Sequence, residues 1–254
     1  MLVFCKMTTQ YLILTKTIII MKSILPLLLF VCLNGFSQTI DLTAYNEFLK
    51  DHVSSKGVVD FDKVLKNVDE LNKITRSFSK ISPNSGWSKS EKKAYWINFY
   101  NANIIKLLSE HYPIKSINYV QNAFSIKVID YAGGKISLDD VEHEILRKLE
   151  DPRIHFALYS TAISSPVLKR TAYENDSVER DLGLATSNFL NDPTKNQIGV
   201  NLSKLSKTFL WYKDDFANLE TMINFINKHS GTAKINAKTK IVYLDYDWNL
   251  HRKI

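Results

Sequence analysis

The chain has 254 residues, of which 45% are hydrophobic and 23% charged, enough to bury one sizeable core. With only 8 glycines and 6 prolines, the composition excludes a disordered or fibrous protein. The formal net charge of +7 is mild for this length and its lysines and arginines are scattered, so no nucleic-acid partner is expected.

The N-terminal part is predicted to be absent from the mature protein. We interpret residues 1–20 as an upstream extension and Met21 as the true start. Residues 21–37 then have the pattern of a secretory signal peptide: Lys22, the apolar run Ile24–Leu33, and small residues up to a cleavage site near Ser37. An apolar run of ten residues is too short to span a bilayer, so no stable membrane span is expected in the mature form.

Cleavage there would make the protein periplasmic or extracellular. A lipoprotein acylated at Cys32 is the alternative, which the bulky Val31 disfavours. Both cysteines, Cys5 and Cys32, would leave with the signal region. The mature chain would then have no thiol for a disulfide, a nucleophile or a metal site.

Residues 40–250 are predicted to form one mainly helical α+β domain with short β-hairpins. The longest helix begins at Ser88, which has capping-box spacing to Glu91, and must end before Pro113. Gly133-Gly134 divides an alternating stretch, which favours a hairpin over 124–138. Further helices are predicted at 41–52, 64–78, 137–149, 182–190, 203–216 and 218–229, a strand at 197–203 and a closing hairpin at 234–250.

Two polar residues lie inside the aromatic part of the longest helix. Asn98 and Asn101 are three apart and therefore share one side of it. Because a buried amide must be hydrogen-bonded, they either brace a loop or line a cavity.

The helix predicted at 137–149 points an acid inward. At about 100° per residue, Glu142 falls between Leu149 and Leu146 on the apolar stripe, whereas His143 falls on the opposite, solvated side. A carboxylate there needs a cationic or donor partner, or else keeps its proton. Two readings stay open: a core brace pairing with Arg153 or a helix end, and a catalytic or ligand-orienting group.

The stretch 153–159 fits either a strand or a buried helix, because periodicity does not separate the two. In both cases His155 has apolar neighbours, so it is either a hydrogen-bonded core residue or a catalytic base. No metal or cofactor is predicted, since the six histidines lack ligand spacing and no nucleotide-binding or hydrolase motif occurs. Asp245, Asp247 and Trp248 could line a pocket, or Trp248 could close the core.

Six collinear stretches over 45–250 resemble the landmarks of the bacterial and plant domain-of-unknown-function family 547. They read AYWINFYNANIIKLLSEHYPIKSI, GGKISLDDVEHEILRK, DPRIHFALYSTAISSPVL, NFLNDP, VNLSKLSKTFLWYKDDF and YLDYDWNL. The resemblance implies a fold that is distantly like that of thiol hydrolases, which is an analogy of fold and not of function.

Family members commonly read H-F-A-L-N-C-x-S-x-S-C-P in the third stretch, so their cysteine positions correspond here to Ser160 and Ser165, and their asparagine to Tyr159. If the first cysteine is a nucleophile in the family, the resemblance places that role on Ser160, with His155 as base and Glu142 as orienting acid. A site shaped for sulfur performs poorly with oxygen, because a serine needs its proton removed by a well-placed base. If the cysteines instead form a disulfide in relatives, the loss of both together is consistent.

The leading hypothesis is therefore an exported binding or structural module without hydrolytic chemistry. The alternative is a hydrolase or acyl-transferase that uses Ser160, His155 and Glu142 on a cell-envelope component or a peptide. A third reading is a surface on which sugars stack. The residues expected to line a cleft are Asn98, Asn101, Tyr159, Ser165 and Asp247, and those of the sugar-stacking surface are Tyr95, Trp96, Tyr100, Trp211 and Tyr212.

Overall fold

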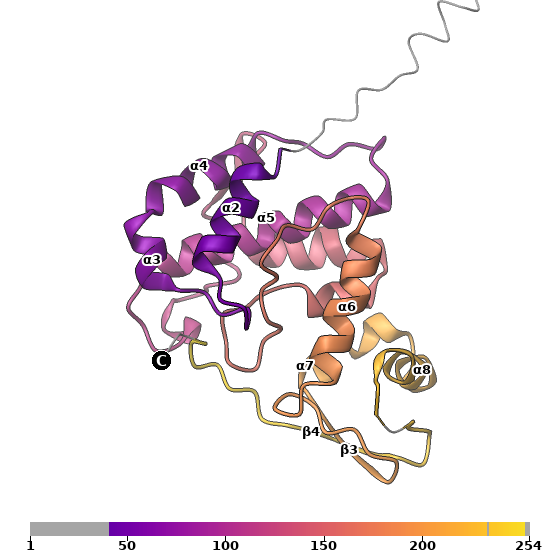
Figure 1. Ribbon diagram of the computed structural model, residues 1–254. Helices are drawn as coiled ribbons and strands as arrows, with labels where there is room; N and C mark the ends of the chain where they lie inside the picture. The colour runs from indigo at the N-terminus through magenta and orange to yellow at the C-terminus, as the bar shows by residue number, and fades with distance from the viewer. Residues whose placement is uncertain (1–40, 233, 252–254) are drawn as a thin grey trace, which may run out of the picture. The chain divides into compact units, whose positions relative to one another are not determined.

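The computed structural model describes residues 41–232 and 234–251 (Figure 1). The predicted upstream extension, the signal peptide and both cysteines lie outside the described residues. Within the described part, no helix combines the length and the apolar character needed to cross a bilayer.

The described part of the chain is mainly helical with two small sheets, which confirms the α+β class. Its α-helices are α2 (Thr43–His52), α3 (Phe61–Lys66), α4 (Val68–Ser79), α5 (Lys89–Ser109), α6 (Val178–Leu190), α7 (Thr208–Trp211) and α8 (Leu219–His229). Shorter turns are η1 (Ile117–Tyr119), the π-helix η2 (Asp140–Leu146), η3 (Arg147–Leu149), η4 (Pro152–Phe156) and η5 (Lys213–Phe216). The strands are β1 (Ile129–Tyr131), β2 (Gly134–Ile136), β3 (Leu202–Leu205) and β4 (Lys240–Tyr243).

Helix α5 is the central element and begins as the sequence predicts. The Ser88 hydroxyl accepts from the Glu91 backbone N–H, and the Glu91 carboxylate accepts from the Ser88 backbone N–H. Most of its side chains are buried all round, because α3 and α4 pack on it from one side and η2 and α6 from others (Figure 1). Its side chains can therefore position several surrounding segments at once.

The predicted hairpin exists, but its turn lies one residue earlier. β1 and β2 pair antiparallel, with Ile129 opposite Ile136, and the turn is Ala132-Gly133. Both turn residues have positive φ, 49° and 81°, as a type I′ turn requires. The predicted helix over 64–78 is two helices, α3 and α4, which meet at Asn67.

The C-terminal region corrects two predictions. The strand predicted at 197–203 is β3, which begins only at Leu202, and the closing hairpin predicted at 234–250 is wrong. Strand β4 instead pairs in parallel with β3, in the register Leu202–Lys240 to Leu205–Tyr243. Alternation along a strand shows which face is buried but does not show which strand is its partner.

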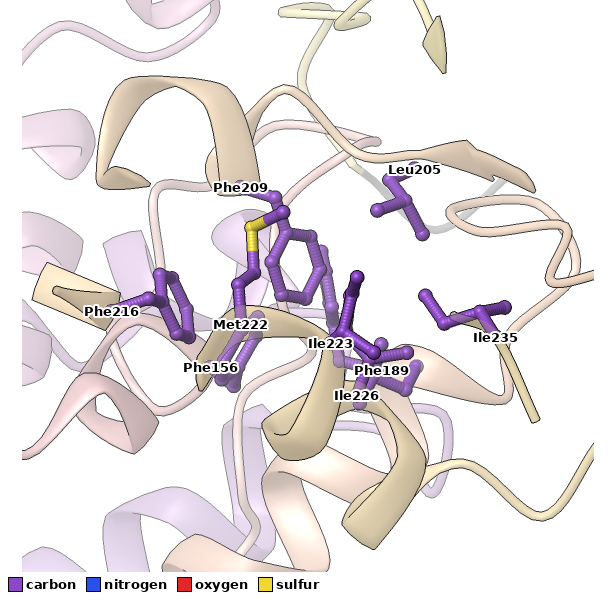
Figure 2. Close-up of a cluster of buried hydrophobic side chains, with 10 residues drawn as sticks. Phe156, Phe189, Leu205, Phe209, Phe216, Met222, Ile223, Ile226 and Ile235 are labelled. Carbon is purple, nitrogen blue, oxygen red and sulfur yellow. The ribbon is translucent and has the colours of Figure 1, made fainter. Parts of the chain in front are cut away.

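A hydrophobic cluster joins η4 to the elements that follow it. Side chains from η4, α6, α7, η5 and α8 meet with Leu205 of β3 and Ile235 (Figure 2). Phe156, in η4, is nearly fully buried there. Burial of an aromatic or large aliphatic side chain contributes about 1.5–3 kcal/mol. Burial of Phe156 in this cluster therefore fixes the backbone of η4 next to His155.

Candidate functional site: a histidine between two carboxylates

A pocket of about 340 Å³, which we call the near pocket, is walled by η2, η4, α7 and the segment after β4. Its aromatic side chains are Tyr100, Phe124, Trp211, Tyr212, Tyr246 and Trp248. Its titratable side chains are Asp139, Glu142, His143, Arg147 and His155, and Ser160 lies beside them. The volume lies in the range of about 300–1,000 Å³ that is typical of ligand pockets.

Glu142 faces inward, as its position on the apolar stripe predicts. Ser137 caps the segment, since its hydroxyl accepts from the Asp140 backbone N–H at 3.0 Å. The chain then turns as a π-helix, a local widening that is frequent at functional sites. Val141 and Leu146 are fully buried on either side, and only 9% of the Glu142 side chain is exposed.

His155 is held in η4, which is neither the strand nor the α-helix considered from the sequence. Asp151 caps this turn and Pro152 begins it. While Phe156 enters the hydrophobic cluster, the His155 side chain, only 1% exposed, lies at the near pocket. Its Nδ1 lies 3.3 Å from Glu142 Oε1, so the inward acid pairs with the imidazole and not with Arg153.

A second carboxylate engages the other ring nitrogen. Asp215, on η5, places Oδ2 2.7 Å from His155 Nε2. Arg147 donates to the same carboxylate through two nitrogens, with Nε–Oδ2 at 2.8 Å and Nη2–Oδ1 at 2.6 Å. The Tyr212 ring stacks on the imidazole, with centroids 3.7 Å apart and planes 18° apart. We call Glu142, His155, Asp215 and Arg147 the histidine cluster.

The electrostatics of this cluster favour a charged histidine. Burial disfavours the imidazolium, but hydrogen bonds and charge from Asp215 and Glu142 outweigh it and raise the pKa of His155. Burial also opposes ionisation of the two acids, yet the imidazole holds the pKa of both below its usual value, helped by Arg147 at Asp215 and by a hydrogen bond from Tyr212 at Glu142. When His155 is protonated, two carboxylates balance an imidazolium and a guanidinium.

Ser160 lies in the same pocket but has a different partner. Its Oγ is 3.2 Å from the hydroxyl of Tyr246, whereas both ring nitrogens of His155 face carboxylates. Burial raises the pKa of Tyr246 to about 12, against the opposing hydrogen bond with Ser160, so this phenol stays neutral at ordinary pH. The arrangement leaves the hydroxyl of Ser160 without an adjacent base.

The two asparagines of α5 act as braces, and neither lines the near pocket. Asn101 donates to the carbonyl of Ala157 at 3.0 Å and accepts from the backbone N–H of Tyr159 at 2.9 Å. Asn98 grips Tyr173 in the same way, at 2.8 and 2.9 Å. Asn101 thereby fixes the chain between His155 and Ser160, so its role is to position the site.

The remaining residues predicted to line a cleft lie elsewhere. Tyr159 and Ser165 are fully buried, because their segment folds under the surface after the Asn101 brace, and Ser165 Oγ donates to the carbonyl of Pro166. Asp247 lines an adjoining cavity of about 410 Å³, which we call the far cavity. The far cavity shares Tyr246 and Trp248 with the near pocket and adds Ser116, Asn118, Tyr119, Asp247 and Asn249.

The predicted sugar-stacking set divides in two. Tyr95, Trp96 and Tyr100 are buried in the body of α5, and only Tyr100 reaches the near pocket. Trp211 and Tyr212 line that pocket. Trp248, for which core and pocket were both considered, is half-buried and lines both cavities.

The sequence did not single out Asp215, Arg147 or Tyr246, although each lies inside a motif-like stretch. The available signal was the paired acid in WYKDDF, which follows two aromatic residues after a single lysine. His143 is half-exposed, as expected, yet it lines the rim of the near pocket and accepts from Arg147 Nη1 at 3.1 Å. In the described ranges, no group of three or more histidine, cysteine and acidic side chains could hold a metal ion.

These features define an α+β protein whose pocket wall carries a buried, charge-balanced histidine. A protein-family model described as "Protein of unknown function, DUF547" matches residues 84–190, from the start of α5 to the end of α6. The match includes Glu142, His155 and Ser160 and confirms the resemblance over residues 84–190; the substitution of cysteines by serines stays a prediction. No curated protein and no solved structure matches the chain, so the implied likeness to thiol hydrolases also stays a prediction.

Proposed function

We propose that the protein is an exported module that binds a cell-envelope component in the near pocket without hydrolysing it. The observation that carries this proposal is the pairing within the site. His155 Nε2 is hydrogen-bonded to Asp215, its Nδ1 lies 3.3 Å from Glu142 Oε1 in a charge contact without hydrogen-bond geometry, and Ser160 pairs with a phenol. General-base catalysis needs a ring nitrogen within reach of the hydroxyl that it deprotonates.

The lining of the pocket supports binding. Six aromatic side chains supply flat faces, and the rim residue Trp211 is 45% exposed. The charged groups are already paired, so they hold their positions before a ligand arrives. Such preorganisation lowers the entropic cost of binding.

Export is supported by the sequence of residues 21–37 alone. A secreted or periplasmic location would place the pocket where envelope glycans and peptides are found. Immunoblotting of cell fractions against a variant with Lys22 and Leu27–Leu29 replaced by acidic residues tests this part. Retention of the wild-type chain in the cytoplasm would contradict it.

Binding is tested with a disaccharide–tetrapeptide muropeptide, which carries both glycan and peptide. Because Trp211 and Trp248 line the pocket, we expect a saturable change in tryptophan fluorescence, and calorimetry should show weaker binding to Trp211→Ala. Leu219→Ala, at an exposed position outside the pocket, is the matched control. Absence of any response to the muropeptide in fluorescence and calorimetry would overturn the proposal.

The alternative hydrolase is kept because Glu142, His155 and Ser160 do line one pocket. It requires a side-chain rearrangement that frees a nitrogen of His155 toward Ser160. Turnover of p-nitrophenyl acetate or of the muropeptide that disappears in Ser160→Ala would establish it. We expect the same residual turnover in wild type and in this variant.

A further inference from the structure

The near pocket and the far cavity are joined by two shared rings. Tyr246 and Trp248 line both, and they belong to the same short segment after β4. Their ring centroids are 4.5 Å apart, and Trp211 lies 4.8 Å from Tyr246 and 5.7 Å from Trp248. The aromatic surface therefore continues without a break from one cavity into the other.

The segment that carries these rings is fixed at both ends. Leu244 N–H donates to the carbonyl of Leu205 at 2.8 Å, and Leu250 N–H donates to that of Lys115 at 2.7 Å. Between them, Ser116 Oγ donates to the carbonyl of Trp248 at 2.7 Å. Backbone anchoring of this kind keeps the rings in place before a ligand binds.

The side chains that line the far cavity are all aromatic or polar, and none is aliphatic. Tyr119 is 72% exposed and extends the ring surface at the rim, and the exposed amides of Asn118 and Asn249 lie at the same end. Ring faces beside amide and hydroxyl groups match a saccharide, whose C–H faces stack while its hydroxyls take hydrogen bonds. An aliphatic peptide side chain would find no matching partner there.

The negative charge of Asp247 restricts the class of saccharide that the far cavity can bind. The carboxylate of Asp247 is exposed at the far cavity, and its Oδ1 accepts only from the backbone of Asn249. A carboxylate in this position repels anionic sugars at close range. The far cavity thus favours neutral units over uronic acids.

We propose that the two cavities form one groove for a chain of neutral sugars such as N-acetylhexosamines, with Tyr246 and Trp248 as a shared stacking surface. This inference rests on the proposed binding function and adds to it the ligand class and the number of subsites. One sugar occupies the near pocket, and further units run over Trp248 toward Tyr119 and Asn118.

Calorimetric titration of the protein with N-acetylglucosamine oligomers of two and four units tests this. We expect the tetramer to bind about tenfold more tightly, which corresponds to one or two added ring contacts. In the double variant Tyr119→Ala, Asn118→Ala, the tetramer-to-dimer ratio should fall to near one. Both positions are exposed, so folding should persist, and the variant's thermal midpoint checks it. Leu219→Ala should keep the wild-type ratio.

Three results would overturn the inference: affinity that does not depend on chain length, a ratio unaffected by the double variant, or displacement of the muropeptide by the stem tetrapeptide and not by the sugar oligomers. Each can occur while the muropeptide itself still binds, which would leave the proposed function standing. Failure of the muropeptide to bind at all would instead remove the proposed function. A trimer of galacturonate, which is anionic, should bind more weakly than the neutral trimer of N-acetylglucosamine.

Discussion

Two clusters of buried charge adjoin the turn η4, and they differ in the residue at their centre. One is the histidine cluster. The other, which we call the lysine cluster, comprises Lys93, Asp151, Arg153 and Glu179. There Asp151 Oδ2 lies 2.8 Å from Lys93 Nζ and 2.6 Å from Arg153 Nη2, and both cations also contact Glu179.

The two centres respond differently to pH. Burial opposes ionisation of Asp151, but Arg153 and Lys93 outweigh it and lower its pKa to about 2. Asp151 therefore stays ionised throughout the neutral range. His155 ordinarily titrates near 6.5, and its paired carboxylates raise its pKa, so the histidine cluster changes charge at a pH above that ordinary value. Similar pairing thus yields a permanent tether on one side of η4 and a titratable pocket wall on the other.

The largest expected effect is at the tether. In Lys93→Met, Asp151 loses a buried partner whose own side chain is only 6% exposed, so the free energy of unfolding should fall by about 4 kcal/mol. Urea denaturation should give the same loss at pH 6 and pH 9. Lys89→Met, which removes a 67% exposed lysine, is the matched control and should change stability by less than about 0.5 kcal/mol. Equal effects of the two substitutions would contradict the stabilising role of the lysine cluster.

His155→Gln should be nearly as costly, about 3 kcal/mol at pH 6, because it leaves two carboxylates facing an uncharged group. The pKa of His155 is raised in the folded state, so its protonation stabilises the fold fully below about 6.5, and this stabilisation is lost as pH rises through the folded-state value. The difference between wild type and variant should therefore shrink from pH 6 to pH 9 in urea denaturation. Parallel pH profiles would show that His155 is not protonated in the native state.

Arg147→Gln should cost less, about 1.5 kcal/mol, because it removes charge-assisted hydrogen bonds from a partly exposed position. Asp215 would then face His155 with its full negative charge, which should raise the pKa of the imidazole further. An NMR titration of the His155 ring protons measures this shift. Arg76→Gln, at an exposed position, should leave the titration in place. A downward movement would contradict the proposed balance of charges.

The smallest effect is expected for Glu179→Gln. Its side chain is 52% exposed, and water partly screens its two contacts, so the loss should be about 0.5 kcal/mol. Urea denaturation from pH 6 to pH 9 should show no change in slope. A loss comparable with that of Lys93→Met would mean that Glu179, and not Asp151, is the anchor of the lysine cluster.

Local features of this molecule could be predicted from the sequence. The capping box of α5, the hairpin before Ser137 and the inward orientation of Glu142 each depend on residues within a few positions of one another. Side-chain spacing reports these directly.

Features that join distant segments could not be predicted. Asp215 reaches His155 only because α7 and η5 fold back over η4, and no local pattern indicates that approach. The parallel pairing of β4 with β3 likewise depends on tertiary packing. The same limit explains why Tyr159 and Ser165 were predicted to line a cleft. Their burial depends on how Asn101 holds the chain before them, and residue type alone does not reveal this contact.

The stretch 244–251 contains the part of both cavities that is synthesised last. Residues 246–249, which include Tyr246 and Trp248, leave the ribosome after every other residue that lines either cavity. His155 and its two acids are synthesised earlier. The segment shared by the two cavities is added last, when the backbone N–H groups of Leu250 and His251 bond to the carbonyls of Lys115 and Thr161. A chain that stopped before Leu244 would still contain the ion pairs of the histidine cluster but would present an open trough in place of a groove.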